Sequence, residues 1–292
     1  MKIVMCQPSI KRFEWELDVA ISNLKKHNIT DVVLLFAEFD HSVFLNLKNK
    51  FPYLDIYTYK DDREDSSYIP SIKPYLWYRF LIENPGFENE DFLYIDSDVI
   101  FREMIDFNNF TQDNEWYGSD CTGYLGYDYI LTTQNGETII SEMAKIVGVN
   151  LNDIKKIKNN CIGAQLIVKK PKAKYWKKVY EDSNKLYHYF EEIDSDIQKW
   201  TAEMWSQLWN MIYFDIEPKS DDEFDFSWAT DNIEEWHKKK IYHNAGVTPN
   251  TDDLFFKGKY TNTSPFNDDL SFVNNDKCSY HYVKAIEYAK NS

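Results

Sequence analysis

Cysteines are scarce in this chain of 292 residues, and their spacing forms no ligand motif. No CxxC or CxxH pair occurs among the four positions, which are Cys6, Cys121, Cys161 and Cys278. Isolated cysteines of this kind are typical of reduced thiols packed inside a protein. The chain is therefore expected to be cytoplasmic.

Long apolar runs are also missing. No segment approaches the roughly 18 consecutive apolar residues that a transmembrane helix needs, so no integral membrane span is predicted. The apolar run at the start of the chain ends at once at Gln7 and Pro8, which is unlike a secretory signal. We expect a soluble protein.

Basic residues are outnumbered, with 33 Lys and Arg against 48 Asp and Glu and a net charge of −15. An acidic surface repels phosphate backbones, which disfavours long duplex nucleic acid and anionic membrane as partners. A local basic pocket that holds one pyrophosphate is compatible with this charge.

Apolar and aromatic residues are plentiful. Apolar residues make up 43 % of the chain, which is enough for a core, and this length suits a single α/β domain. Aromatic residues make up 17 % and serve either to pack a core or to stack on rings in a cleft.

Short apolar runs alternate with amphipathic segments in the first hundred residues. Strands are predicted at Ile3–Cys6, Val32–Phe36, Leu54–Tyr59 and Phe92–Ile95, with helical spacing between them. In the second half, helices are predicted at Thr138–Val147, Ala173–Phe190 and Trp200–Ile212, and strands at Cys161–Val168 and Ile241–His243. The alternation predicts an α/β fold with a mainly parallel sheet and helices on both faces. Ligands bind such sheets beyond the carboxyl ends of the strands.

The most informative motif is FLYIDSDV at positions 92–99. It places Asp96 and Asp98 directly after a buried strand, two residues apart. Carboxylates in this arrangement provide hard oxygen ligands for Mg²⁺ or Mn²⁺. A metal there can bridge the phosphates of a nucleoside diphosphate and stabilise it as a leaving group. The alternative is an acidic surface turn or a helix cap.

The motif and its setting resemble the glycosyltransferases of the GT-A fold, in particular the glycogenin-like and bacterial-galactosyltransferase-like families. The resemblance implies a hexosyltransferase that uses a nucleoside diphosphate sugar, with UDP as the expected nucleotide, and Mn²⁺ or Mg²⁺ at Asp96 and Asp98, with Ser97 beside the donor. It covers residues 1–260, divided into a nucleotide-binding half, 1–110, and a half for donor sugar and acceptor, 111–260. The acceptor is open: a glycan, a protein, a lipid-linked saccharide or a modified base. Residues 261–292 are expected to form a tail packed on the domain.

Two later segments extend the resemblance. Residues 159–168 resemble the small-residue segment that lines donor sugar and acceptor, which implies roles for Gly163, Ala164 and Gln165. Residues 241–246 resemble the segment whose histidine completes the metal site, here His243, with Gly246 following. From the residues alone, His243 is equally a strand-end histidine bonded to the backbone.

The resemblance also implies roles for Lys257 and Glu203. Lys257 is a candidate for gripping the diphosphate, although the lysine of these families usually follows the histidine sooner. Glu203 stands alone where the families carry two acids and an asparagine near the donor sugar. If configuration is retained, Glu203 and Gln165 would orient and stabilise the reactants; if it is inverted, Glu203 or Asp196 would be the general base.

Other donor contacts are suggested by position alone. Gln7 and Pro8 follow the first strand, where the amide can read a base edge or simply form a turn. Tyr57 can stack on the base or pack internally. Lys73 and Arg79 can offset the diphosphate charge or remain solvated helix residues.

Three alternatives to a transferase remain. A haloacid-dehalogenase-like phosphatase also opens its site with Asp-x-Asp, but on its first strand. A nucleotidyltransferase usually needs a third acid and a glycine-rich phosphate loop, whereas none of the nine glycines follows the first strand. The third alternative is a binding module that kept the fold and lost turnover.

Overall fold

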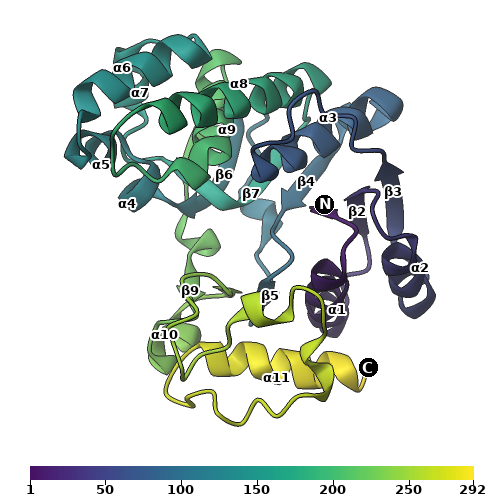
Figure 1. Ribbon diagram of the computed structural model, residues 1–292. Helices are drawn as coiled ribbons and strands as arrows, with labels where there is room; N and C mark the ends of the chain where they lie inside the picture. The colour runs from purple at the N-terminus through teal and green to yellow at the C-terminus, as the bar shows by residue number, and fades with distance from the viewer. The chain divides into compact units, whose positions relative to one another are not determined.

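The computed structural model describes residues 1–292, which form two compact units (Figure 1). The first unit contains Met1, Tyr59–Tyr94 and Asn108–Asp222. The second unit contains Lys2–Thr58, Ile95–Phe107 and Glu223–Ser292. Each unit is therefore assembled from stretches that are distant in the sequence.

The second unit begins with an alternation of strand and helix. Strand β1 (Lys2–Pro8) is parallel to β2 (Val32–Ala37), and helix α1 (Lys11–Lys26) connects them. Every residue of β2 is buried, which explains its unbroken apolar sequence. Helix α2 (His41–Lys50) is capped by Asp40, whose carboxylate accepts the backbone N–H of Ser42, and leads to β3 (Asp55–Tyr59). The strand order here is β3-β2-β1.

A small three-stranded sheet completes the second unit. Its order is β5 (Val99–Phe101), β10 (Ile241–His243) and β9 (Phe226–Trp228), with β10 antiparallel to β5 and parallel to β9. Helix α11 (Ser279–Lys290) packs beside α1, as Figure 1 shows, and the short α10 (Ile233–Lys238) precedes β10. Buried aromatic rings from α1, β10, α11 and the loop after β10 meet in one core.

The first unit contains the other four strands and most of the helices. The strand order is β4 (Asp91–Tyr94), β7 (Ile162–Lys169), β6 (Glu115–Asp120) and β8 (Glu217–Ser220). The helices are α3 (Ile72–Glu83), α4 (Thr122–Leu125), α5 (Tyr127–Thr132), α6 (Gly136–Val147), α7 (Leu151–Lys156), α8 (Ala173–Glu192) and α9 (Ala202–Tyr213). Helices α3 and α8 bury Trp77 against Trp176, with stacked rings 4.9 Å apart.

The structure confirms the α/β fold with a mainly parallel sheet that the alternating sequence predicts. The exception is β7, which is antiparallel to both β4 and β6. Strand β7 also bulges: Gly163 pairs with Ser119 and Leu166 pairs with Gly118, so Ala164 and Gln165 are extra residues. Ala164 has a φ of 56°, a left-handed conformation that costs an alanine free energy. Bulges of this kind re-aim side chains and are common beside active sites.

All four cysteines are buried free thiols, and each unit contains two of them. Cys6 and Cys278 belong to the second unit, and Cys121 and Cys161 to the first. Burial raises the pKa of the Cys161 thiol to about 11 and raises that of Cys278. Among the helices, none combines the length and the apolar character that crossing a bilayer requires.

Candidate metal centre

The two aspartates of the FLYIDSDV motif lie in the short turn before β5. The turn is held within the second unit by two backbone hydrogen bonds. The N–H of Ile95 donates to the carbonyl of Val4 at 3.2 Å, and the N–H of Asn244 donates to the carbonyl of Asp98 at 3.0 Å. Ile95 and Asp98 of the motif are therefore tied to the middle of β1 and to the residue after β10.

The register of β10 brings His243 to the motif. His243 pairs with Val99, the residue after Asp98, so its imidazole faces the carboxylates. His243 Nε2 lies 3.2 Å from Asp98 Oδ1 and 3.9 Å from Asp96 Oδ2. One ligand atom from each of these three residues falls within 4.8 Å of the others. The structure thus unites residues separated by about half the chain.

Lys257 also reaches this cluster. Its ammonium donates a hydrogen bond to Asp98 Oδ2, while the side chain of Asp98 is only 4 % exposed. Burial alone raises the pKa of Asp98, but the charges of Lys257 and His243 outweigh that effect and hold its pKa well below the ordinary value. The charges of Asp98 and Glu16 in turn raise the pKa of Lys257 above its usual value, against the opposing effect of burial. Asp98 therefore stays an anion with balanced charge.

A second group of residues orients the middle of the motif; Ser97 and Gln7 were expected near the donor, whereas Glu16 and Arg12 were not expected there. Ser97 Oγ donates to Glu16 Oε2 at 2.8 Å and accepts from Gln7 Nε2 at 3.1 Å. Glu16 is fully buried and forms an ion pair with Arg12 at 2.6 Å on the same helix. Burial and the charge of Asp98 raise the pKa of Glu16. The i,i+4 spacing of Arg12 and Glu16 looks like an ordinary helix pair, so only tertiary contact reveals their role.

The residues present fit a divalent cation of the Mn²⁺ or Mg²⁺ type. The ligand atoms of two carboxylates and one imidazole lie within 4.8 Å of one another; the carboxylates suit either ion, and an imidazole is also a ligand for a transition metal. A metal-ligating group normally has a further partner that fixes its orientation. The buried Glu16–Ser97–Gln7 chain holds the serine between the two aspartates and so fixes the backbone that carries them.

Three further residues that were predicted to contact the donor, Pro8, Tyr57 and Gly246, also belong to the second unit. Pro8 ends β1, one residue after Gln7. Gly246 has a φ of +81°, which explains a glycine there, three residues after His243. Tyr57 lines a shallow surface hollow with Phe44 and Leu54. The donor contacts of Pro8, Tyr57 and Gly246 stay predictions.

Two of the residues predicted to line the donor sugar, Gln165 and Gly163, lie in the first unit and pack closely against residues of that unit. Gln165, in the β7 bulge, accepts a hydrogen bond from Ser119 Oγ at 2.5 Å. At Gly163 a Cβ would lie 2.7 Å from the Met204 side chain, so only glycine leaves the segment undisturbed. The hydrogen bond from Ser119 is thus made at the bulge that contains Ala164.

The candidate bases of the first unit differ in burial. Glu203 lies in the first turn of α9 and is 4 % exposed, and its backbone N–H donates to the hydroxyl of Tyr68 at 2.9 Å. Asp196 is exposed and accepts from the backbone N–H of Gln134 at 2.8 Å. The buried Glu203 is the better placed of the two for a role that needs a dry environment.

The two basic candidates lie on α3. Arg79 forms an ion pair with Glu83 at 2.8 Å and a hydrogen bond to the hydroxyl of Tyr75 at 2.9 Å. Lys73 lies near the start of the same helix. Their roles as diphosphate partners remain predictions.

No family model matches the chain, and no curated protein matches its sequence. Two solved structures are similar in fold. One is the apo structure of the bifunctional glycosyltransferase WbbM, with a TM-score of 0.53 and 10 % identity. The match covers 98 % of this chain and 50 % of that one, so the chain spans half of WbbM's length.

The second is the galactosyltransferase LgtC in complex with donor and acceptor sugar analogues. The TM-score is 0.50 and the identity 13 %, over 97 % of this chain and 95 % of that one. At such identities the likeness establishes the fold alone. The chain has a GT-A type glycosyltransferase fold, as the resemblance of its sequence motifs implied.

Proposed function

We propose that this chain is a divalent-metal-dependent glycosyltransferase that uses a nucleoside diphosphate sugar, with UDP as the expected nucleotide. The observation that carries the proposal is the convergence of Asp96, Asp98 and His243 on one point, in a chain whose fold is that of glycosyltransferases. LgtC, whose structure holds donor and acceptor sugar analogues, supports a two-substrate transfer.

In this proposal the cluster holds a Mn²⁺ or Mg²⁺ ion, which supplies positive charge for the departing diphosphate. Asp96, Asp98 and His243 bind it, and Glu16 and Gln7 hold Ser97 so that the turn keeps its shape. Lys257 is the cationic side chain bonded to Asp98. When another cation balances Asp98, the ammonium of Lys257 becomes available to a phosphate oxygen.

The sugar-transfer step is assigned to the first unit by its sequence motifs. Glu203 is buried and Gln165 is fixed in a bulge, which suits groups that orient a sugar hydroxyl. Gly163 and Ala164 form the small-residue segment of the same bulge. These assignments extend the proposal beyond the metal centre and are tested separately from it.

Thermal unfolding with nucleotides tests the metal centre first. The protein is heated with UDP, GDP or CDP, each with Mn²⁺, Mg²⁺ or a chelator. A ligand that binds only the native state, at 100 times its Kd, stabilises it by about 2.7 kcal/mol, which is measurable as a rise in Tm. We expect a rise for UDP with metal and none for UDP with chelator.

The alternatives give different results in the same experiment. A rise of equal size with chelator would contradict metal-dependent nucleotide binding. A phosphatase of the haloacid-dehalogenase type would hydrolyse a simple phosphomonoester and show no preference among nucleotides. Slow metal-dependent hydrolysis of one UDP-sugar, measured by UDP release, would separate a working transferase from a binding module.

A further inference from the structure

A second pocket lies in the second unit, away from the metal centre. Its volume is about 250 Å³, and it is formed by α1, β5, α10 and α11. Strand β5 separates it from the aspartates: Asp98 precedes the strand, whereas Arg102 follows it and lines the pocket. At about 3.3 Å per residue the two positions are roughly 13 Å apart. None of the residues assigned to the metal or the donor lines this pocket.

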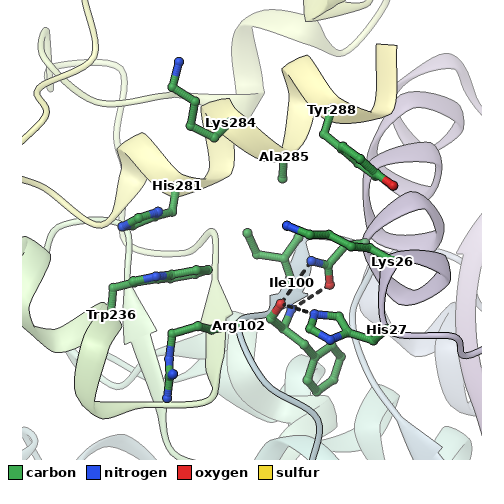
Figure 2. A pocket seen from close by; sticks show the side chains of 11 residues that line it. Lys26, His27, Ile100, Arg102, Trp236, His281, Lys284, Ala285 and Tyr288 are labelled. Carbon is green, nitrogen blue, oxygen red and sulfur yellow. Dashed lines mark hydrogen bonds between the residues drawn. The ribbon is translucent and has the colours of Figure 1, made fainter. Parts of the chain in front are cut away.

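The floor of the pocket is the outer edge of strand β5, where side chains bond the backbone groups of Phe101. Strand β5 is an edge of its sheet, and the backbone N–H and C=O of Phe101 both bond Asn23, at 2.8 and 3.0 Å. His27 Nε2 lies 2.9 Å from the same carbonyl (Figure 2). Because side chains of α1 satisfy this edge, a ligand would meet a floor without free backbone groups.

The charge of the lining is opposite to that of the protein. In a chain with net charge −15, the pocket is lined by Lys26, Arg102 and Lys284 and by no acidic residue. The charged ends of Arg102 and Lys284 point away from the cavity in Figure 2: Arg102 Nε donates to the carbonyl of Lys239 at 2.9 Å, and Lys284 pairs with Glu287 at 2.8 Å. Lys26 has no ion pair, and its ammonium lies 5.7 Å from the ring of Tyr288, with its tip over the pocket in Figure 2.

One wall of the pocket also carries an unused polar atom. His281 stacks on Trp236 with ring centroids 4.1 Å apart, and its Nε2 is buried without a hydrogen-bond partner. Buried polar atoms normally have a partner, so this nitrogen is suited to a group that the pocket receives. Ala285 and the ring of Tyr288 provide an apolar surface next to it.

We propose that this pocket binds a small phosphorylated molecule, with the phosphate at the ammonium of Lys26 and the carbon skeleton against Ala285 and Tyr288. Guanidinium and ammonium groups are the usual phosphate partners in proteins. The volume is slightly below the range of drug-sized ligand sites, which suits a monosaccharide phosphate better than a nucleotide. The site is independent of the nucleotide bound at the proposed metal centre.

Calorimetric titration in the presence of a chelator tests this proposal, so that metal-dependent binding does not contribute. The probes are a hexose 1-phosphate, inorganic phosphate and the neutral hexose. We expect saturable binding of the hexose phosphate, and none of the neutral hexose. Binding of inorganic phosphate with equal affinity would assign the recognition to the phosphate alone; weaker binding would show that the apolar wall contributes. No saturable binding of either phosphate up to about 10 mM would overturn the proposal.

Matched lysine variants locate the binding. Lys25 and Lys26 are adjacent exposed residues of α1, but only Lys26 lines the pocket. K26Q should weaken hexose phosphate binding about tenfold, since it removes a charge-assisted contact, whereas K25Q should leave it unchanged. Equal effects of the two variants would show that the anion binds elsewhere. K26Q should also retain the nucleotide- and metal-dependent rise in Tm, so the failure of one proposal is distinguishable from that of the other.

Discussion

At the scale of single residues, Asp98 is the most constrained group of the metal centre. It is almost fully buried and contacts both His243 and Lys257. Asp98→Asn keeps the shape and removes the charge, so we expect Mn²⁺ binding to weaken by about 100-fold or more, because one of two anionic ligands is lost. Titration calorimetry measures this, and far-UV circular dichroism checks that the fold is kept.

Asp31 provides the control for that substitution. It belongs to the same unit and pairs with Lys2 at the surface, at 2.8 Å. Asp31→Asn should leave Mn²⁺ affinity unchanged. Unaltered Mn²⁺ binding by Asp98→Asn would remove the motif from the proposed metal site.

Ser97 tests the support of the metal centre without removing a ligand. Its hydroxyl joins Glu16 and Gln7, so Ser97→Ala leaves both of these buried groups short of a hydrogen bond. Loss of such an orienting contact typically lowers metal affinity 10- to 100-fold, and we expect about tenfold here. The measurement is a Mn²⁺ titration of the protein without nucleotide.

A second buried serine shows whether the effect is specific. Ser22 donates to Asp18 at 3.2 Å elsewhere on α1. Ser22→Ala should lower Tm while Mn²⁺ affinity stays constant. If both variants lower Tm and neither changes Mn²⁺ affinity, Ser97 has only a structural role.

Sequence patterns predicted the three residues that lie together here, and they gave no sign of Arg12 and Glu16. Asp96 and Asp98 follow an apolar strand, which is a local signal, and His243 was found through the resemblance of its segment. Arg12 and Glu16 have the spacing of an exposed ion pair on a helix surface. Nothing in the local sequence shows that Glu16 is buried against Ser97. Contacts between residues about 80 positions apart carry no local pattern.

At the scale of elements, the outer edge of strand β5 is bonded mainly by one asparagine, with His27 also near the Phe101 carbonyl. Asn23 of α1 satisfies both backbone groups of Phe101 at the sheet edge. Asn23→Ala leaves a buried N–H and C=O without this partner, and we expect the free energy of unfolding to fall by about 1–3 kcal/mol. Urea denaturation measures it, with Asn46→Ala as the control, since exposed Asn46 bonds only Glu14.

Helix α11 carries a histidine that should make stability depend on pH. Burial, with a smaller effect of nearby His237, lowers the pKa of His281 from 6.5 to about 4. The folded state thus binds fewer protons than the unfolded state between these values, so stability falls as the pH is lowered from 6.5 to 4. His281→Phe keeps a ring against Trp236 and should reduce this loss of Tm.

The corresponding control is an exposed histidine of another helix, His41 of α2. His41→Phe should show the same acid-side loss of Tm as the unaltered protein. A curve for His281→Phe that parallels the original across this range would assign the pH dependence to other groups.

The strands and helices of the first hundred residues were predicted well, and several later ones were missed. Strands β1, β2 and β4 contain continuous apolar runs that identify them, whereas β3, with the sequence DIYTY, combines aromatic and β-branched residues with polar ones. Strand β5 has three residues and β6 contains Glu, Gly, Ser and Asp, so tertiary pairing rather than pattern defines both. Residues 261–292 were expected only as a tail, because many polar residues of α11 obscure the apolar face formed by Tyr282, Val283 and Ile286.

At the scale of the whole molecule, all residues of the proposed metal centre belong to one of the two units. Asp96, Asp98, His243 and Lys257 all belong to the second unit. Mn²⁺ alone should therefore slow amide hydrogen exchange most strongly in peptides covering 95–107 and 241–258, because binding to the native state suppresses local opening there. Mass spectrometry resolves these peptides.

Asp98→Asn should abolish that protection under the same conditions. Protection spread evenly over all peptides, or confined to the first unit, would contradict a metal centre built from these residues. The same experiment with hexose phosphate and chelator should instead protect peptides of α11.

Because each unit contains two buried thiols, the reactivity of the cysteines can report the unfolding of each unit separately. A thiolate is the form that alkylating reagents attack, and a buried thiol of raised pKa is protected from them until the backbone around it opens. Alkylation at Cys6 and Cys278 would time the opening of one unit, and alkylation at Cys121 and Cys161 that of the other. A single mass spectrum, without any introduced label, would then show whether the two units melt together or in turn.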